Sequence, residues 1–341
     1  MEPSKPSWGI VSTVCEPAAL LVAFAAHHLE LGAARVHLYL DQPNPGLRAL
    51  IGHDPRVVLV DAGPEHYRRA LGRRRPQGIN RRQIVNANHA AATSDVDWLF
   101  HLDADEFLTG ADPAAELAAV PAGTLGFRVQ NGERVFVAGG PEASVFDGAM
   151  VMPVPRPGQL RKLRGGDMAR YTMHGLMGHV LGKSALRLGH GAEIGIHAAR
   201  LPPGSAHRAS RLRLCHFDGM TRLHWVSKML RHIDNRMIYD GARGRSDYRT
   251  RQLVALRMLG GDMAAALAFH DRLRVIGPRL AWKLRRRGIL CETGVAPEAA
   301  IARQYPTLAA AMTEALGVAR FDADLLAHQP QLAPPGQRAV A

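Results

Sequence analysis

The sequence predicts an α/β protein with a mainly parallel, Rossmann-like sheet, followed by a C-terminal helical appendage. Three observations lead to this. The first hundred residues alternate strand and helix patterns, acidic residues follow several strands, and helical patterns dominate after residue 220. A chain of 341 residues with 47% hydrophobic residues can bury the core of one large domain and an appendage.

Each predicted strand of the first part is short and rich in apolar or β-branched residues: 9–14, 36–40, 57–60 and 98–102. Helices are expected from Pro17 to Gly32 and over 80–94, where apolar residues recur at helical spacing. Asp41, Asp61 and Asp103 each follow a strand. Since ligands bind at the carboxyl ends of parallel strands, these acids should line one rim, although Asp is also common in turns.

In the later part of the chain, short apolar runs predict strands at 125–129 and 134–137. Apolar residues at helical spacing predict helices at 223–235, 248–259 and 263–275. We therefore expect a main domain over 7–240, a helical appendage over 241–330 and a loose tail over 331–341.

The chain is strongly basic, with a formal net charge of +13 that comes mostly from clustered arginines. Such a surface attracts nucleic acid, anionic lipid or acidic glycans. Aromatic residues are only 6% and are not interleaved with the basic runs, which argues against nucleic-acid binding.

No cysteine pairing or membrane span is expected from the sequence. The three cysteines form no CxxC pair, and the longest apolar run, 18–26, is too short to cross a bilayer. We expect a cytoplasmic protein whose basic appendage contacts the anionic inner face of the membrane.

Three carboxylates stand within four residues at Asp103-Ala104-Asp105-Glu106, directly after an apolar strand. Their mutual repulsion would be relieved by Mn²⁺ or Mg²⁺, which prefer oxygen ligands. In an extended Asp-x-Asp segment both side chains point the same way and reach one ion. An acidic turn or a helix N-cap is the alternative.

The string Trp98-Leu-Phe-His-Leu-Asp-Ala-Asp-Glu-Phe-Leu108 resembles the DxD segment of bacterial family-2-like glycosyltransferases, which have a GT-A fold. Further segments resemble that family: 12–17, 27–32, 38–41, Arg82-Gln83 with Asn86-Ala87, Gly182-Lys183-Ser184, Gly195-Ile-His197 and Leu214-Cys-His216-Phe217. The resemblance spans about residues 8–235 and says nothing of the acceptor.

The resemblance implies a metal-dependent transfer of sugar from a nucleotide-sugar donor to a carbohydrate or lipid-linked glycan. Asp103, Asp105 and His216 would coordinate Mn²⁺ or Mg²⁺ at the donor diphosphate. The donor-binding residues would be Thr13, Glu16, Asp41, Arg82, Asn86, Asp103 and Lys183.

The catalytic groups are expected to be Glu106, which would orient Asp105, and Asp147. No motif singles out the base, and Glu142, Asp167 and His174 are alternatives to Asp147. Cys15 stands where many relatives have a lysine-asparagine pair, so donor contacts there can differ.

Two other functions remain open: a basic nucleic-acid-binding protein, and a Mg²⁺-dependent nucleotidyltransferase or phosphohydrolase. The sequence has neither a P-loop nor an HExxH motif, which disfavours P-loop enzymes and zinc hydrolases.

Overall fold

A computed structural model describes residues 5–154, 166–234, 248–329 and 332. The chain forms two compact units, and each is discontinuous in sequence. The first unit comprises Met1–Asn131, Leu181–Leu214 and Gly294–Thr313, and the second comprises Gly132–Val180, Cys215–Thr293 and Glu314–Ala341. The predicted boundary between residues 240 and 241 and the predicted tail, Leu332 apart, lie outside the described residues.

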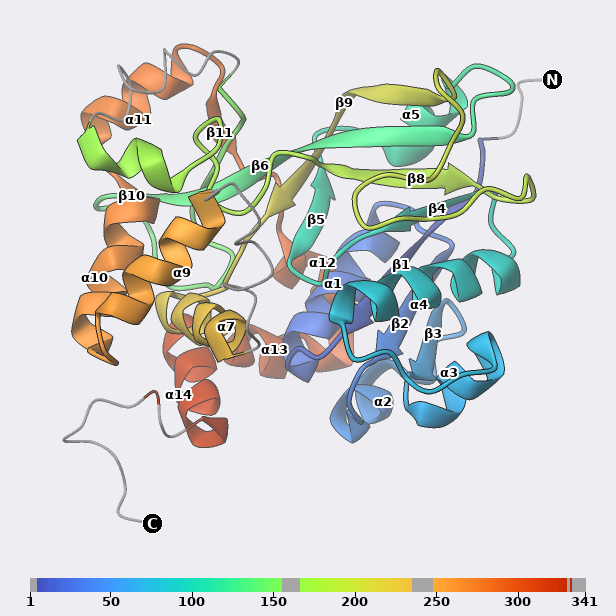
Figure 1. Cartoon of the computed structure of the whole chain (residues 1–341), viewed down its shortest axis with the longest axis horizontal. Helices are drawn as coiled ribbons and strands as arrows, with labels where there is room; N and C mark the ends of the chain where they lie inside the picture. The colour runs from blue at the N-terminus through green and yellow to red at the C-terminus, as the bar shows by residue number, and fades with distance from the viewer. Residues whose placement is uncertain (1–4, 155–165, 235–247, 330–331, 333–341) are drawn as a thin grey trace. The chain divides into compact units, whose positions relative to one another are not determined.

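The first unit is built on a mainly parallel sheet (Figure 1). Its parallel strands are β1 (Trp8–Val14), β2 (Arg35–Leu40), β3 (Val57–Asp61) and β4 (Trp98–His101), in the order β3-β2-β1-β4. β8 (Lys183–Arg187) runs antiparallel beside β4, and residues 126–129 run antiparallel beside β8. The order 3-2-1-4 matches the first four positions of the Rossmann order 3-2-1-4-5-6, so the predicted α/β class and mainly parallel sheet are confirmed.

Helices cover this sheet: α1 (Ala18–Glu30), α2 (Pro45–Ile51), α3 (Pro64–Leu71), α4 (Ile79–Thr93), α5 (Pro113–Ala118) and α12 (Pro297–Gln304). α1 is buried almost all round, because small and apolar residues from Leu20 to Leu29 pack on several neighbours, α12 among them. α4 packs on β1 through Ala87 and Ala90, and their small side chains let its backbone approach the strand. This close approach lets α4 reach the carboxyl ends of the strands.

The second unit combines a small sheet with helices. Its strands are the second half of β6 (Gly126–Val137), β7 (Ala149–Val151), β10 (Val275–Ile276) and β11 (Leu290–Glu292). Its helices are η1 (Gly166–Tyr171), α7 (Arg222–Asp234), α9 (Tyr248–Met258), α10 (Met263–Arg274), α11 (Pro278–Arg285) and α14 (Val318–His328). The core around Trp225 and Phe269 joins sheet and helices, and the predicted C-terminal helices are present.

Four more elements complete the described chain: β5 (Glu106–Thr109), β9 (Ala206–His216), η2 (Pro306–Leu308) and α13 (Ala309–Ala315). β5 pairs with β9. The prediction of two strands at 125–129 and 134–137 is wrong, since both belong to the single strand β6. Gly132 lies within β6 because a Cβ there would come within 2.6 Å of Met150 Cγ.

Among the described helices, none combines the length and the apolar character needed to cross a bilayer.

Candidate functional site

The acidic segment after β4 forms a turn. The Glu106 backbone N–H donates to the Asp103 carbonyl oxygen at 3.0 Å, and the Asp103 N–H donates to Glu106 Oε2 at 2.8 Å. The expectation of an extended Asp-x-Asp is therefore wrong, because the strand ends at His101 and the chain bends at once. The two-residue repeat of a strand therefore does not determine where the side chains of Asp103 and Asp105 point.

Lys183 of β8 neutralises this turn from within the first unit. Its Nζ lies 2.8 Å from Asp103 Oδ2 and 3.2 Å from Glu106 Oε2, and both Lys183 and Glu106 are fully buried. Gln83 Nε2 donates to the other oxygen, Asp103 Oδ1, at 2.7 Å. An internal ammonium group therefore relieves part of the repulsion that the sequence interpretation assigned to a bound divalent ion, namely the part between Asp103 and Glu106.

Both members of this ion pair are charged at neutral pH. Burial alone would raise the pKa of Asp103, but the charge and the hydrogen bond of Lys183, with a smaller share from His101, together hold that pKa well below its usual range. Burial alone would lower the pKa of Lys183, but Asp103 and Glu106 raise it above its usual value. The His101 ring nearby stays neutral, since burial and then the Lys183 charge lower its pKa.

One face of α4 reaches three neighbouring strand ends. Arg82 donates from Nε and from Nη2 to the two carboxylate oxygens of Asp41, after β2, at 2.7 and 2.9 Å. Asn86 Nδ2 donates to Thr13 Oγ1 in β1 at 2.9 Å, and Gln83 binds Asp103 after β4 as described above.

The expectation that Asp41 and Asp103 line one rim is confirmed by these contacts. From β1 the chain adds β2 and β3 on one side of the sheet and β4 on the other side. In doubly wound sheets, ligands bind in the crevice at such a switch point. Asp61 is different, because it is exposed and pairs with Arg48. The Glu16 carbonyl oxygen accepts a hydrogen bond from Asn44 Nδ2 at 3.3 Å, and its predicted donor contact stays a prediction.

In the second unit, the buried carboxylate of Glu133 organises the surroundings of His216. It accepts hydrogen bonds from three consecutive backbone amides, those of Met177, Gly178 and His179, at 2.6, 2.5 and 3.1 Å. His216 Nδ1 lies 3.7 Å from Glu133 Oε1. A Cβ at residue 178 would come within 2.6 Å of Glu133 Oε1 and 2.7 Å of His216 Cε1, so a larger residue there would displace one of these side chains.

Asp218, two residues after His216, is buried and surrounded by cations. It pairs with Arg249 at 3.0 Å, with Lys228 at 3.3 Å and with Arg274. These charges outweigh burial and hold the pKa of Asp218 well below its usual range. Its backbone has a φ of 29°, in the left-handed region that Asp tolerates better than most residues.

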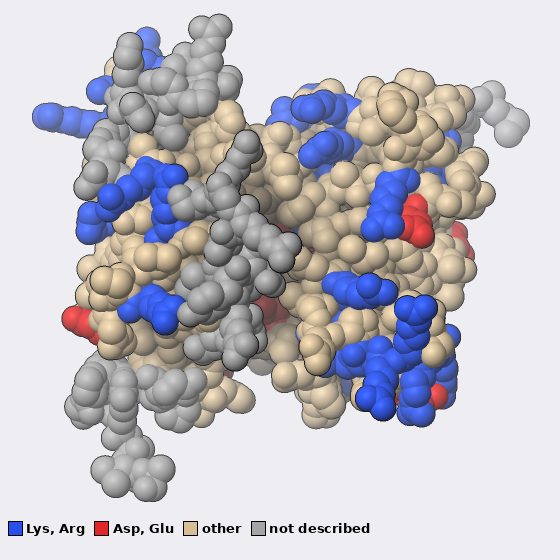
Figure 2. All heavy atoms as spheres, viewed as in Figure 1, with Lys and Arg blue, Asp and Glu red and all other residues tan. Residues whose placement is uncertain are grey.

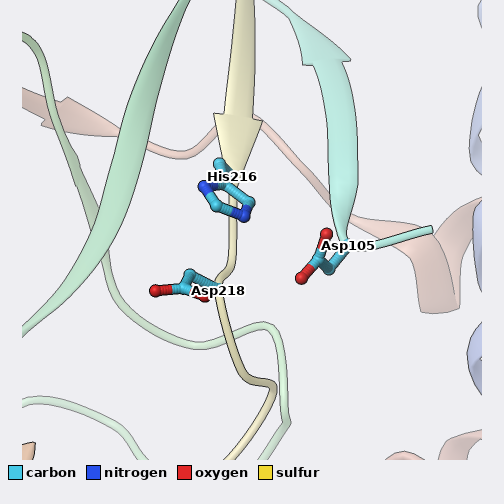
Figure 3. Close-up of side chains that lie close together, drawn as sticks. All are labelled: Asp105, His216 and Asp218. Atoms are coloured by element: carbon cyan, nitrogen blue, oxygen red, sulfur yellow. The ribbon is translucent and has the colours of Figure 1, made fainter. Parts of the chain in front are cut away.

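Figure 3 shows three side chains of the kinds that bind metal ions: Asp105 of the first unit, and His216 and Asp218 of the second. Asp105 precedes β5 and His216 ends β9, and these two strands pair. Carboxylates supply oxygen donors and imidazole supplies a nitrogen donor, and both kinds bind divalent cations in proteins.

The three residues of this group do not fit a cation equally well. Three cationic side chains already engage the Asp218 carboxylate and would repel a divalent ion there. Asp218 is therefore a poor ligand for a cation, whereas Asp105 and His216 are both among the predicted ligands. The predicted coordination by Asp103 stays a prediction, and both of its oxygens accept hydrogen bonds from Lys183 and Gln83.

The predicted catalytic residues have structural partners. Glu106 is committed to Lys183 and to the turn. Asp147 Oδ2 accepts hydrogen bonds from the backbone amides of Ala143 and Ser144 at 2.7 and 2.8 Å. Both assignments stay predictions.

Two of the three alternative catalytic bases also have structural partners. Glu142 pairs with Arg222 at 3.0 Å, and His174 Nδ1 bonds the Val154 carbonyl oxygen at 2.9 Å. The side chain of Asp167 lies outside the described residues.

Glu133, Asp218 and Arg274 were missed by the sequence reasoning. His216-x-Asp218 repeats the spacing of Asp103-x-Asp105, and that signal could have pointed to Asp218. No local signal marks Glu133, because its role depends on an amide loop that is more than forty residues away.

No family model and no curated protein matches the chain. Among solved structures, the chain is similar to HddC from Yersinia pseudotuberculosis with a TM-score of 0.27 and 11% identity, over 54% of this chain and 74% of that chain. A likeness at this level carries no argument about function, so the functional argument depends on the residues themselves.

Proposed function

We propose that this protein is a metal-dependent glycosyltransferase of the GT-A type, acting on a nucleotide-sugar donor and a carbohydrate or lipid-linked glycan acceptor at the cytoplasmic side. The observation that carries the proposal lies within the first unit, where α4 binds both Asp41, after β2, and Asp103, after β4, at the carboxyl ends of parallel strands. The Rossmann-like strand order supports it, because Asp41 and Asp103 lie at the ligand-binding edge of such a sheet.

In this proposal Asp105 would help to hold Mn²⁺, and the ion would supply Lewis-acid stabilisation of the leaving nucleoside diphosphate. Lys183 keeps Asp103 ionised and fixed in the turn that presents Asp105. Asp41 accepts hydrogen bonds from the donor nucleoside, and Arg82, held by Asp41, faces phosphate oxygens.

The test is a thermal-shift screen of nucleoside diphosphates and their sugars, with and without Mn²⁺. A ligand that binds only the folded protein stabilises it by about 2.7 kcal/mol at a hundred times its Kd. We expect one nucleotide to raise the Tm, and to raise it further with Mn²⁺. Release of that nucleoside diphosphate from its sugar by the wild-type protein would then report turnover.

A matched pair of variants separates the metal ligand from other acids. Asp105→Asn keeps the size of the side chain and should abolish the Mn²⁺-dependent part of the shift. Asp61→Asn changes an exposed acid at another strand end and should leave it intact. The proposal fails if no nucleotide or nucleotide sugar raises the Tm, or if Asp105→Asn keeps the full Mn²⁺ effect.

A further inference from the structure

Helix α11 of the second unit has one buried and one exposed face. Ala281 and Leu284 are buried in the core of this unit, and Leu280 packs against that core. Residues 279, 282, 283 and 286 recur at helical spacing on the opposite face, and all four are exposed. The helix is thus fixed to its unit by one side, and the other side is free for a partner.

The exposed side is cationic. Its cations are Arg279, Lys283, Arg285, Arg286 and Arg287, and the sequence has no acidic residue between Asp271 and Glu292. None of these five side chains forms an ion pair within the described part of the chain. Figure 2 shows Lys and Arg side chains gathered around α11, at the upper left. A surface with this uncompensated positive charge attracts an anionic partner.

Trp282 is at the centre of this surface and is 57% exposed. The other three tryptophans, Trp8, Trp98 and Trp225, are buried. The guanidinium carbon of Arg286 lies 4.9 Å from the centre of the Trp282 ring. A large exposed aromatic ring beside cations matches the composition of segments that sit at the headgroup level of a bilayer.

We propose that α11 and the turn after it, residues 278–287, dock on an anionic lipid membrane. The five cations contact lipid headgroups, and the Trp282 ring inserts at the boundary between headgroups and acyl chains. Single-stranded nucleic acid is a poorer fit, because its successive bases need several stacking aromatics and this face has one. This inference does not depend on the proposed glycosyltransferase activity.

The experiment uses the full chain and the fluorescence of its tryptophans. Since Trp282 is the exposed one, a blue shift on adding vesicles reports its insertion. We expect a blue shift with phosphatidylcholine vesicles containing phosphatidylglycerol, none with phosphatidylcholine alone, and quenching by brominated acyl chains. Binding should weaken as salt is added, because the headgroup charges are screened.

Two variants and one matched control test the residues. Each cation lost near an anionic surface weakens binding about fivefold, so Lys283→Glu/Arg286→Glu should weaken flotation with the vesicles by at least about twenty-five-fold. Arg73→Glu/Arg74→Glu makes the same change in net charge on exposed residues of the first unit and should leave binding within about twofold of wild type. Trp282→Phe should abolish the blue shift while flotation is largely retained.

Three results would overturn the inference: equal flotation with neutral and anionic vesicles, equal losses in the two charge-reversed variants, or anionic binding without any change in Trp282 emission. Binding of single-stranded RNA that shifts the Trp282 emission more than anionic vesicles do would assign the surface to nucleic acid instead.

Discussion

Replacing Lys183 with methionine removes the cation that holds the acidic turn together and keeps the length of the side chain. Asp103 and Glu106 would then lose the cation that they share. Removing one partner of a buried ion pair costs roughly 3–5 kcal/mol. Glu106 is fully buried and should contribute most of that cost, whereas the Asp103 side chain is 35% exposed and water offsets part of its share.

The loss should depend on pH. In the variant, repulsion and burial raise the pKa values of the two carboxylates above their unfolded values, so the folded state binds more protons. The variant therefore regains stability relative to wild type as the pH falls from 8 to 5. Lys183→Met/Glu106→Gln should recover at least half of the loss, because it removes the buried charge.

Urea unfolding at pH 8 and pH 5 measures both effects, with Lys283→Met as the control at an exposed lysine. That control should change the free energy of unfolding by less than about 0.5 kcal/mol. A loss below about 1 kcal/mol for Lys183→Met, or a loss that is the same at both pH values, would refute the reasoning.

Two further predictions concern buried groups. Burial lowers the pKa of His27 to about 4, so the unfolded state takes up a proton first and stability is lost as the pH falls from 6.5 towards 4. The change amounts to about 3 kcal/mol, at about 1.4 kcal/mol per pKa unit. His27→Gln, which can still donate to the Leu108 carbonyl oxygen, should flatten the acid limb of a urea-unfolding series, and an unchanged limb would contradict this. Glu133→Gln leaves three amide donors with one oxygen acceptor and should cost about 2–4 kcal/mol in thermal unfolding, and a loss below about 0.5 kcal/mol would show that the amides find other partners.

The fold of the first unit follows closely from local sequence patterns. The strands β1, β2, β3 and β4 fall within a residue or so of the predicted runs, because short apolar segments between polar turns allow few other arrangements. The merging of two predicted strands into β6 was not foreseeable, since Gly132 interrupts the pattern and its reason lies in the distant Met150.

The candidate site was partly predictable. Asp41 and Asp103 could be placed on one rim because parallel strands end at the same edge. The partner of Asp103 could not be identified, because Lys183 comes from a strand eighty residues later, and only the antiparallel pairing of β8 with β4 brings it there. Local spacing carries no information about such long-range neighbours.

The internal lysine has a consequence for how the protein handles metal. Structural zinc sites bind the ion as part of folding, and the chain unfolds when the ion is chelated. Here Asp103 and Glu106 already share an ammonium group of the chain itself, so this part of the turn is held without an ion. Under the proposed function, an ion bound by Asp105 would then be able to enter and leave with the donor while the turn stays in place.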